Sequence, residues 1–182
     1  YTLSGVPNTG FTEALAFVFQ KRDLMLMGYD QAVDDNTTLD IFWGLYEIMG
    51  VSLVDMRMWQ WLYAHPDATA QQLREATLAI AKEVWNTYYY PVLGEQDSPI
   101  LACYSHMVNA PMYLPNYPFG HIVEFQLEEH LAQFPTKQAF ADEIMRIYKL
   151  GKLTPNQWMQ QAVGAKVSTT PILNAVEAIL KK

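Results

Sequence analysis

The sequence predicts an all-α protein, and three observations carry that prediction. Apolar residues recur at helical spacings along most of the chain, and several segments open with a capping residue and close at proline or glycine. No segment has a convincing strand alternation, and the nearest to one is 87–92. Hydrophobic residues make up 51% of the 182, which is enough for a sizeable helical core.

Three helices are expected in the first half of the chain. The run 11–28 is apolar on most sides, as in a buried helix. The segment 36–65 carries apolar residues along one helical face, with Gly50 as a candidate break or kink and a proline directly after it. Thr69 then opens a capping-box pattern with a glutamine three residues on, which predicts a helix over 69–90 that the next proline stops.

The second half continues the helical pattern around a proline-rich stretch. Thr154 and Thr170 each precede a proline, which suits the first turn of a helix and predicts two helix starts. The remaining helices are expected over 100–107, 119–134 and 136–151. Because no repeat, charge block or low-complexity linker interrupts the pattern, we expect a single helical domain over 1–182.

Composition excludes several classes of function. The net charge of −7 and a pI near 5.0 argue against a nucleic-acid partner, which would require a basic surface. The lone Cys103 rules out an internal disulfide framework and a cysteine-rich zinc site. No 18-residue apolar run is present, so no membrane span is predicted. The chain opens without Met in a loop-like run, so we expect it to be part of a longer protein.

Glu13 is the most informative single residue because it is the only charge in the run 10–19. An acid in the first turn of a helix is stabilised by the helix dipole, by about 0.3–1 kcal/mol. Alternatively, a lone glutamate on an apolar helix can supply an oxygen ligand to zinc if further ligands come from elsewhere. Taken alone, the residue favours the helix-dipole interpretation, since acids are common in first helical turns.

The segment 106–130 holds three of the four histidines and two tyrosines. His121 and Glu124 share a helix face, as metal ligands in helical bundles do, but H-E-x-x-H is absent from the chain. We therefore regard a metal site on His121, Glu124 or His130 as the weaker interpretation, with 128–130 a solvated face.

A proline-broken segment holding His106, Tyr113 and Tyr117 suggests a different chemistry. Neutral histidine and tyrosine donate hydrogen bonds, and such donors can stabilise a developing oxyanion. The plainer alternative is a proline-rich loop that packs its aromatic rings on the core, and spacing alone favours it.

Several short motifs resemble the angiotensin-converting-enzyme group of gluzincin zinc metallopeptidases, which are related in fold to the thimet-type oligopeptidases. Gly10-Phe-Thr-Glu-Ala14 is similar to the family's G-F-H-E-A, and Tyr117-Pro-Phe-Gly-His-Ile-Val-Glu-Phe-Gln-Leu127 is similar to its Y-F-V-S-F-I-I-Q-F-Q-F. His106 and Tyr113 keep a family spacing of seven, with one residue inserted before Tyr117. The tail resembles the family's closing turn through Gly164, Ser168 and Pro171. The likeness touches most of the chain and is thin over 29–99.

The resemblance implies an all-α half of a gluzincin-type helical fold and a role for each matched residue. Glu13 would be the third zinc ligand, and Tyr117 would donate to the tetrahedral intermediate. His106 would bind the substrate backbone or the oxyanion, and Tyr113 would line the cleft near the substrate's C-terminal side. The cofactor implied is zinc and the substrate is a peptide.

Four departures from the family pattern change what is expected. Phe17 stands where the family has an acid that orients a zinc histidine, Thr12 replaces the histidine before the zinc ligand, and Tyr104 replaces a lysine that holds the substrate's terminal carboxylate. Release of dipeptides is therefore doubtful, and an oligopeptidase fits better. Because H-E-x-x-H is missing, the resemblance implies the C-terminal portion of a zinc peptidase, inactive alone and without tightly bound zinc.

The expected partners are a peptide substrate and the N-terminal portion of the same protein, and we expect either homodimerisation or burial by a partner to cover the apolar helix 11–27. A non-catalytic helical peptide- or protein-binding module derived from a peptidase is the alternative, favoured slightly by Phe17 and Tyr104. A helical scaffold that resembles peptidases by chance is the third interpretation.

Overall fold

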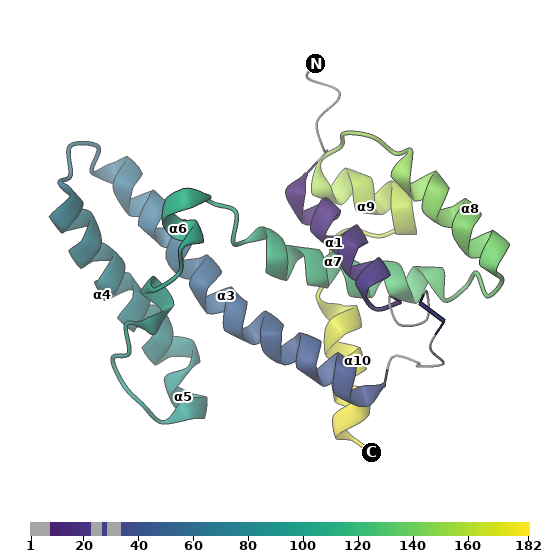
Figure 1. Cartoon of the computed structure of the whole chain (residues 1–182), viewed down its shortest axis with the longest axis horizontal. Coiled ribbons are helices and arrows are strands. Elements are labelled where there is room, and N and C mark those ends of the chain that lie inside the picture. Colours follow the sequence, from purple (N-terminus) through teal and green to yellow (C-terminus); the bar gives the residue numbers. More distant parts are fainter. Residues whose placement is uncertain (1–7, 23–26, 29–33) are drawn as a thin grey trace. The chain divides into compact units, whose positions relative to one another are not determined.

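The computed structural model describes residues 8–22, 27–28 and 34–182, and these residues are helical without any strand (Figure 1). The predicted all-α class is therefore confirmed. The chain folds into two compact units, one formed by residues 44–118 and the other by residues 1–43 together with 119–182. The expectation of a single domain stays a prediction.

Residues 44–118 are built on a helical hairpin of α3 (Asp35–Ala64) and α4 (Ala70–Tyr88), which lie side by side in Figure 1. Thr69 caps α4 as predicted: its hydroxyl accepts from Gln72 N–H at 3.3 Å, and its own N–H donates to the Gln72 side chain at 2.9 Å. The predicted helix 36–65 agrees with α3 to within one residue at each end. The helix passes through Gly50 without a break.

A tyrosine hydroxyl enters the hydrogen-bond ladder of α3 at Gly50. The Gly50 N–H donates to Tyr89 Oη at 2.8 Å, and the same hydroxyl donates to the carbonyl of Tyr46, which is the ordinary helical acceptor for Gly50. Tyr89 is 4% exposed. Gly50 makes room for this ring, since a Cβ there would lie 2.6 Å from Tyr89 Cζ. The feature ties the middle of α3 to the end of α4.

This buried phenol should make the chain sensitive to alkali. Burial raises the pKa of Tyr89 from 10.0 to about 12, with smaller raising effects from Tyr46 and Glu47. The protonated Tyr89 phenol contributes its full share of folding stability below pH 10. That contribution is lost between pH 10 and pH 12, because in this range the phenol of the unfolded chain ionises before that of the folded chain. Between pH 10 and pH 12, we expect the urea concentration at the midpoint of unfolding to fall less in Tyr89→Phe than in the wild type.

The matched control for this prediction is Tyr63→Phe, at a side chain that is 75% exposed. That variant should keep the wild-type dependence on alkaline pH. An equal fall in all three proteins would show that Tyr89 does not hold its proton more tightly in the folded state.

After α4 the chain makes α5 (Tyr90–Leu93), the 3₁₀ turn η1 (Ile100–Ala102) and the one-turn helix α6 (His106–Asn109). The single helix predicted over 100–107 is wrong. Leu101 and Met107 both belong to the core of this unit, yet positions six apart lie on different sides of one helix. The break between η1 and α6 lets both side chains reach the same core.

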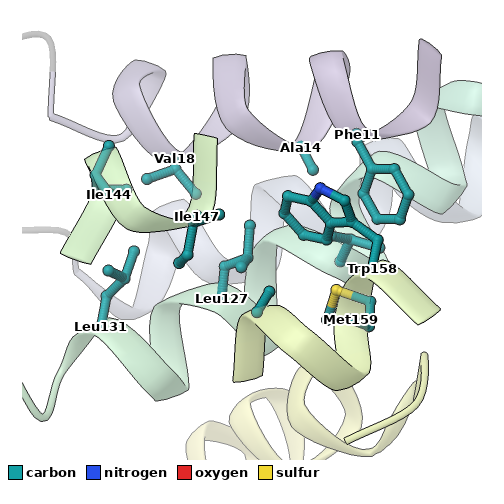
Figure 2. Close-up of a cluster of buried hydrophobic side chains, with 11 residues drawn as sticks. Phe11, Ala14, Val18, Leu127, Leu131, Ile144, Ile147, Trp158 and Met159 are labelled. Carbon is teal, nitrogen blue, oxygen red and sulfur yellow. The ribbon is translucent and has the colours of Figure 1, made fainter. Parts of the chain in front are cut away.

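In the unit formed by residues 1–43 and 119–182, four helices pack around one apolar cluster (Figure 2). They are α1 (Thr9–Gln20), most of α7 (Asn116–Leu131), α8 (Lys137–Tyr148) and α9 (Pro155–Val163). The buried members are Phe11, Ala14, Val18, Val123, Leu127, Leu131, Ile144, Ile147, Trp158, Met159 and Ala162. Trp158 stacks on Phe11 with ring centroids 4.3 Å apart. The last helix, α10 (Thr170–Leu180), buries Ile172 and Val176.

Two helix boundaries differ from the prediction in ways that concern the site. α7 begins at Asn116, three residues before the predicted start, so Tyr117 lies in its first turn. Pro118 is tolerated there because the first N–H groups of a helix need no intrahelical acceptor. α1 ends at Gln20, and Arg22 donates to the carbonyl of Val18 at 2.6 Å, which satisfies a C-terminal carbonyl of that helix. Residues 23–26 of the predicted helix lie outside the described part of the chain.

α1 buries one of its faces in the chain's own core, as Figure 2 shows for Phe11, Ala14 and Val18. Its other side carries Phe19, 37% exposed, beside an apolar cavity of about 390 Å³ that α8 and α9 also line. The prediction that a second copy or another partner covers this helix remains a prediction.

Candidate functional site

The structure brings His106, Tyr113 and Tyr117 together in one cluster within residues 44–118. The ring of His106 lies 6.0 Å from that of Tyr113 and 6.3 Å from that of Tyr117, measured between centroids. The two tyrosine rings are 5.4 Å apart and nearly perpendicular. All three side chains are half-buried. The three residues that the resemblance assigned to one site are therefore neighbours in space.

Consecutive turns between α6 and α7 position these side chains. The Ala110 N–H closes α6 by donating to the carbonyl of His106 at 2.9 Å, and the Tyr113 N–H donates to the carbonyl of Ala110 at 3.1 Å. The side-chain amide of Asn116 donates to the carbonyl of Tyr113 at 2.8 Å, just where α7 begins. Between them Met112 has φ of +59°, a left-handed conformation that is unusual for a residue with a side chain.

Tyr104 extends the cluster to a fourth ring, with its centroid 5.3 Å from that of His106. It is 38% exposed. Sequence comparison identified Tyr104 only as a departure from a family lysine. Its position two residues before His106 was the available signal.

His106 combines a half-buried ring with a buried Nδ1 that has no hydrogen-bond partner in the described structure. An unpaired N–H in that place costs more than an unpaired lone pair, since buried acceptors go unsatisfied more often than donors. We therefore assign the proton of the neutral imidazole to Nε2. In this tautomer the histidine is a hydrogen-bond donor through Nε2, the property that an oxyanion site requires.

Glu13 lies in the second turn of α1, in the unit formed by residues 1–43 and 119–182. The first turn of α1 holds no acidic residue, so the helix-dipole explanation loses its basis. Its backbone packs tightly on α7: a Cβ added to Gly120 would lie 2.8 Å from Glu13 Cβ and 3.2 Å from the backbone nitrogen of Ala14. Glycine at 120 thus permits the close approach of the two helices at the half-buried Glu13.

No group of three or more His, Cys, Asp and Glu side chains suited to a metal occurs within residues 8–22, 27–28 and 34–182. Glu13 could give zinc one carboxylate oxygen, whereas a catalytic zinc site takes three protein ligands and a water. The described residues therefore do not form a self-contained zinc site around Glu13.

Glu124 forms a buried ion pair with Lys21 and a hydrogen bond with His121. Glu124 is fully buried, with Oε2 2.8 Å from His121 Nδ1 and Oε1 2.9 Å from Lys21 Nζ. The lysine contact is an ion pair without the alignment of a hydrogen bond. Lys21 also lies 3.8 Å over the ring of Phe125. His121 and Glu124 are three residues apart on α7, so helix geometry brings them together, and Lys21 joins them from the end of α1.

Phe17 completes this arrangement by stacking on His121, with centroids 3.9 Å apart and planes 3° from parallel. The residue that departs from the family acid therefore packs against an imidazole. An imidazole held in this way by Phe17 and Glu124 is well ordered without a metal.

The run 128–130 is not a fully solvated face, contrary to the prediction. Glu128 accepts two hydrogen bonds from Arg22, one of them at 2.7 Å, and His130 Nε2 lies 2.6 Å from Glu143 Oε1. Hydrogen bonds from Arg146 hold the pKa of Glu143 below its ordinary range, and His130 adds to this effect. Only Glu129 of the three is exposed. Helical periodicity could not reveal these partners, since Arg22 lies just after α1 and Glu143 lies on α8.

In the described residues no helix is both long and apolar enough to cross a membrane. No protein-family model matches the chain, and no curated protein or solved structure matches it either.

Proposed function

We propose that this chain is the C-terminal portion of a zinc-dependent peptidase that hydrolyses peptide bonds. The observation that supports the proposal is the cluster of His106, Tyr113 and Tyr117, since three residues selected by a motif lie within 6.3 Å of one another by ring centroid.

In the proposed reaction the side chains of this chain bind and stabilise. Tyr117 Oη and His106 Nε2–H would donate hydrogen bonds to the oxygen that gains negative charge when the peptide carbonyl is attacked. Tyr113 would contact the substrate beyond the scissile bond, and Glu13 would give one carboxylate oxygen to the metal. Zinc, when bound, supplies Lewis-acid polarisation and a water of lowered pKa.

The proposal predicts how zinc binds. This chain alone should bind no stoichiometric zinc, because Glu13 is a single ligand. A longer form of the protein that carries H-E-x-x-H ahead of Tyr1 should bind one zinc per chain. In that form Glu13→Gln should weaken zinc binding by more than the roughly 10–100-fold typical of losing a residue that only orients a ligand. Elemental analysis and competition with a chelator measure both quantities.

Two matched variants of the longer form make the test specific. Glu129→Gln, at an exposed carboxylate on α7, should leave zinc binding unchanged. Tyr117→Phe should keep its zinc but lose about 10²–10³-fold in kcat on a peptide substrate, the usual cost of removing one oxyanion donor. The proposal is refuted if the upstream coding sequence lacks H-E-x-x-H, or if the present chain binds one zinc through Glu13 on its own.

The second candidate is a non-catalytic helical module that binds a peptide or protein. The stacking of Phe17 on His121 favours it, because the acid expected to orient a zinc histidine is replaced by a ring that is already packed. In that case the four-ring cluster with Tyr104 would bind an extended segment without cleaving it. An upstream sequence without H-E-x-x-H, combined with peptide binding that Tyr104→Ala and Tyr113→Ala weaken, would support this module over the enzyme.

A further inference from the structure

The aromatic cluster of the candidate site has four rings that meet at steep angles. Its members are Tyr104, His106, Tyr113 and Tyr117. The plane of His106 is tilted by 48° to that of Tyr104 and by 42° to that of Tyr113. Tyr117 stands nearly perpendicular to His106 and to Tyr113, at 70° and 68°. None of these four contacts is a parallel stack, so the cluster presents aromatic walls of different inclination.

The spacing of the rings suits a compact cation. The centroids of His106, Tyr113 and Tyr117 are 5.4–6.3 Å apart. A cation over the middle of the three therefore lies within about 6 Å of each centroid, the distance at which a ring face attracts it. Tyr104 is 38% exposed and the other three side chains are half-buried, so a ligand reaches the rings from solvent and loses part of its water there. Loss of water strengthens the attraction between a cation and a ring.

The charge of the surrounding sequence favours the same ligand. No lysine or arginine occurs between residues 83 and 136, the stretch that holds the whole cluster. Residues 44–118 contain seven Asp and Glu against three Lys and Arg. An acidic surface attracts cations and disfavours anions, and the faces of aromatic rings are themselves negative. The net charge and the ring quadrupoles therefore act in the same direction.

We propose that this aromatic cluster binds an organic cation, the ammonium or guanidinium group of a peptide side chain. The cation contacts ring faces, whereas Tyr117 Oη and His106 Nε2 lie at ring edges, so the two kinds of contact do not compete. Tyr104 is the specificity-determining residue in this role. That the cation belongs to a peptidase substrate rests on the proposed function, whereas cation binding can be measured on this chain alone.

The test compares two probes of the same shape, choline and its uncharged isostere 3,3-dimethylbutan-1-ol. NMR titration of this chain should shift the ring signals of His106 and of the tyrosines in the cluster. The dissociation constant for choline should be about ten-fold lower than that for the alcohol, because only choline carries the charge that the ring faces attract.

Variants at position 104 separate the ring face from the hydroxyl group. Tyr104→Leu removes the face and should abolish most of the preference for choline, whereas Tyr104→Phe keeps the face and should retain it. Tyr63→Leu is the matched control, at a tyrosine that is 75% exposed in the same unit, and should bind choline as the wild type does. No variant changes the net charge, so a loss confined to Tyr104→Leu cannot come from the general attraction of an acidic protein.

Three results would overturn the inference. They are equal dissociation constants for the two probes in the wild type, no ring shifts with either probe, and an equal loss in Tyr63→Leu and Tyr104→Leu. None of them depends on zinc or on hydrolysis, so a longer form without peptidase activity would refute the proposed function and leave the cation site standing.

An active longer form tests the assignment of the cation to the substrate. Peptides with lysine on the C-terminal side of the scissile bond, where Tyr113 is placed, should have a kcat/KM about ten-fold above that of peptides with norleucine there. Equal values would overturn this assignment.

Discussion

Replacing Lys21 with methionine should destabilise the unit formed by residues 1–43 and 119–182 by about 3 kcal/mol, because it leaves the buried charge of Glu124 without its cation. The side chains of Lys21 and Glu124 are 9% and 0% exposed, so water cannot replace the lost partner. The remaining contact from His121 places the cost at the lower end of the range for a broken buried pair. Urea denaturation followed by circular dichroism measures the change.

Lys181→Met is the matched control, because Lys181 pairs with Glu177 on the surface at the same distance, 2.9 Å. Those side chains are 74% and 63% exposed, so Lys181→Met should lower the free energy of unfolding by no more than about 0.5 kcal/mol. The double variant Lys21→Met with Glu124→Leu should recover most of the lost stability, since an apolar pair of similar size often replaces a buried ion pair at little cost. Equal effects of Lys21→Met and Lys181→Met would contradict the buried pair.

Local chemistry is what made most of the helices predictable. Thr69 and Thr154 begin helices because each is followed three residues later by a glutamine that returns to the cap, an interaction contained within four residues. Gly164 ends α9 in a left-handed conformation that glycine adopts without strain. Signals of this kind need no knowledge of the rest of the chain.

The failed helix predictions share a cause in long-range packing. The sequence 100–107 can form a helix locally, but Leu101 and Met107 are drawn to one core, and the helix divides into η1 and α6. Gly50 suggested a break, yet α3 continues past it, and the hydroxyl of Tyr89, thirty-nine residues away, lies beside the glycine. Neither partner is visible from local periodicity.

The residues named in the structure also differ in whether the local sequence could identify them. His106, Tyr113 and Tyr117 lie within twelve residues, so their spacing was enough to identify them as a set. Asp55 gave no signal, because an acid inside a long helix is ordinarily a surface residue and only the fold shows that it is buried.

Gly50→Ala should lower the free energy of unfolding by about 2–3 kcal/mol, although alanine normally has a higher helix propensity than glycine. The new methyl group would lie 2.6 Å from both Cε2 and Cζ of Tyr89, a ring that is 4% exposed and stacked on Trp85 with centroids 5.3 Å apart. The ring cannot withdraw without leaving the core, so the hydroxyl must give up its bonds to Gly50 and Tyr46. Thermal and urea unfolding of the chain measure the loss.

Gly44→Ala supplies the comparison on the same helix. Gly44 is exposed, and a Cβ there meets nothing within 4 Å, so alanine should stabilise α3 by about 0.5–1 kcal/mol through its better helix propensity. The change in the free energy of unfolding is thus expected to have opposite signs in Gly50→Ala and Gly44→Ala. A general effect of alanine on α3 could not produce this difference. If Gly50→Ala proved as stabilising as Gly44→Ala, the Tyr89 hydroxyl would not occupy the ladder of α3, and the alkaline sensitivity expected from that buried phenol should be absent as well.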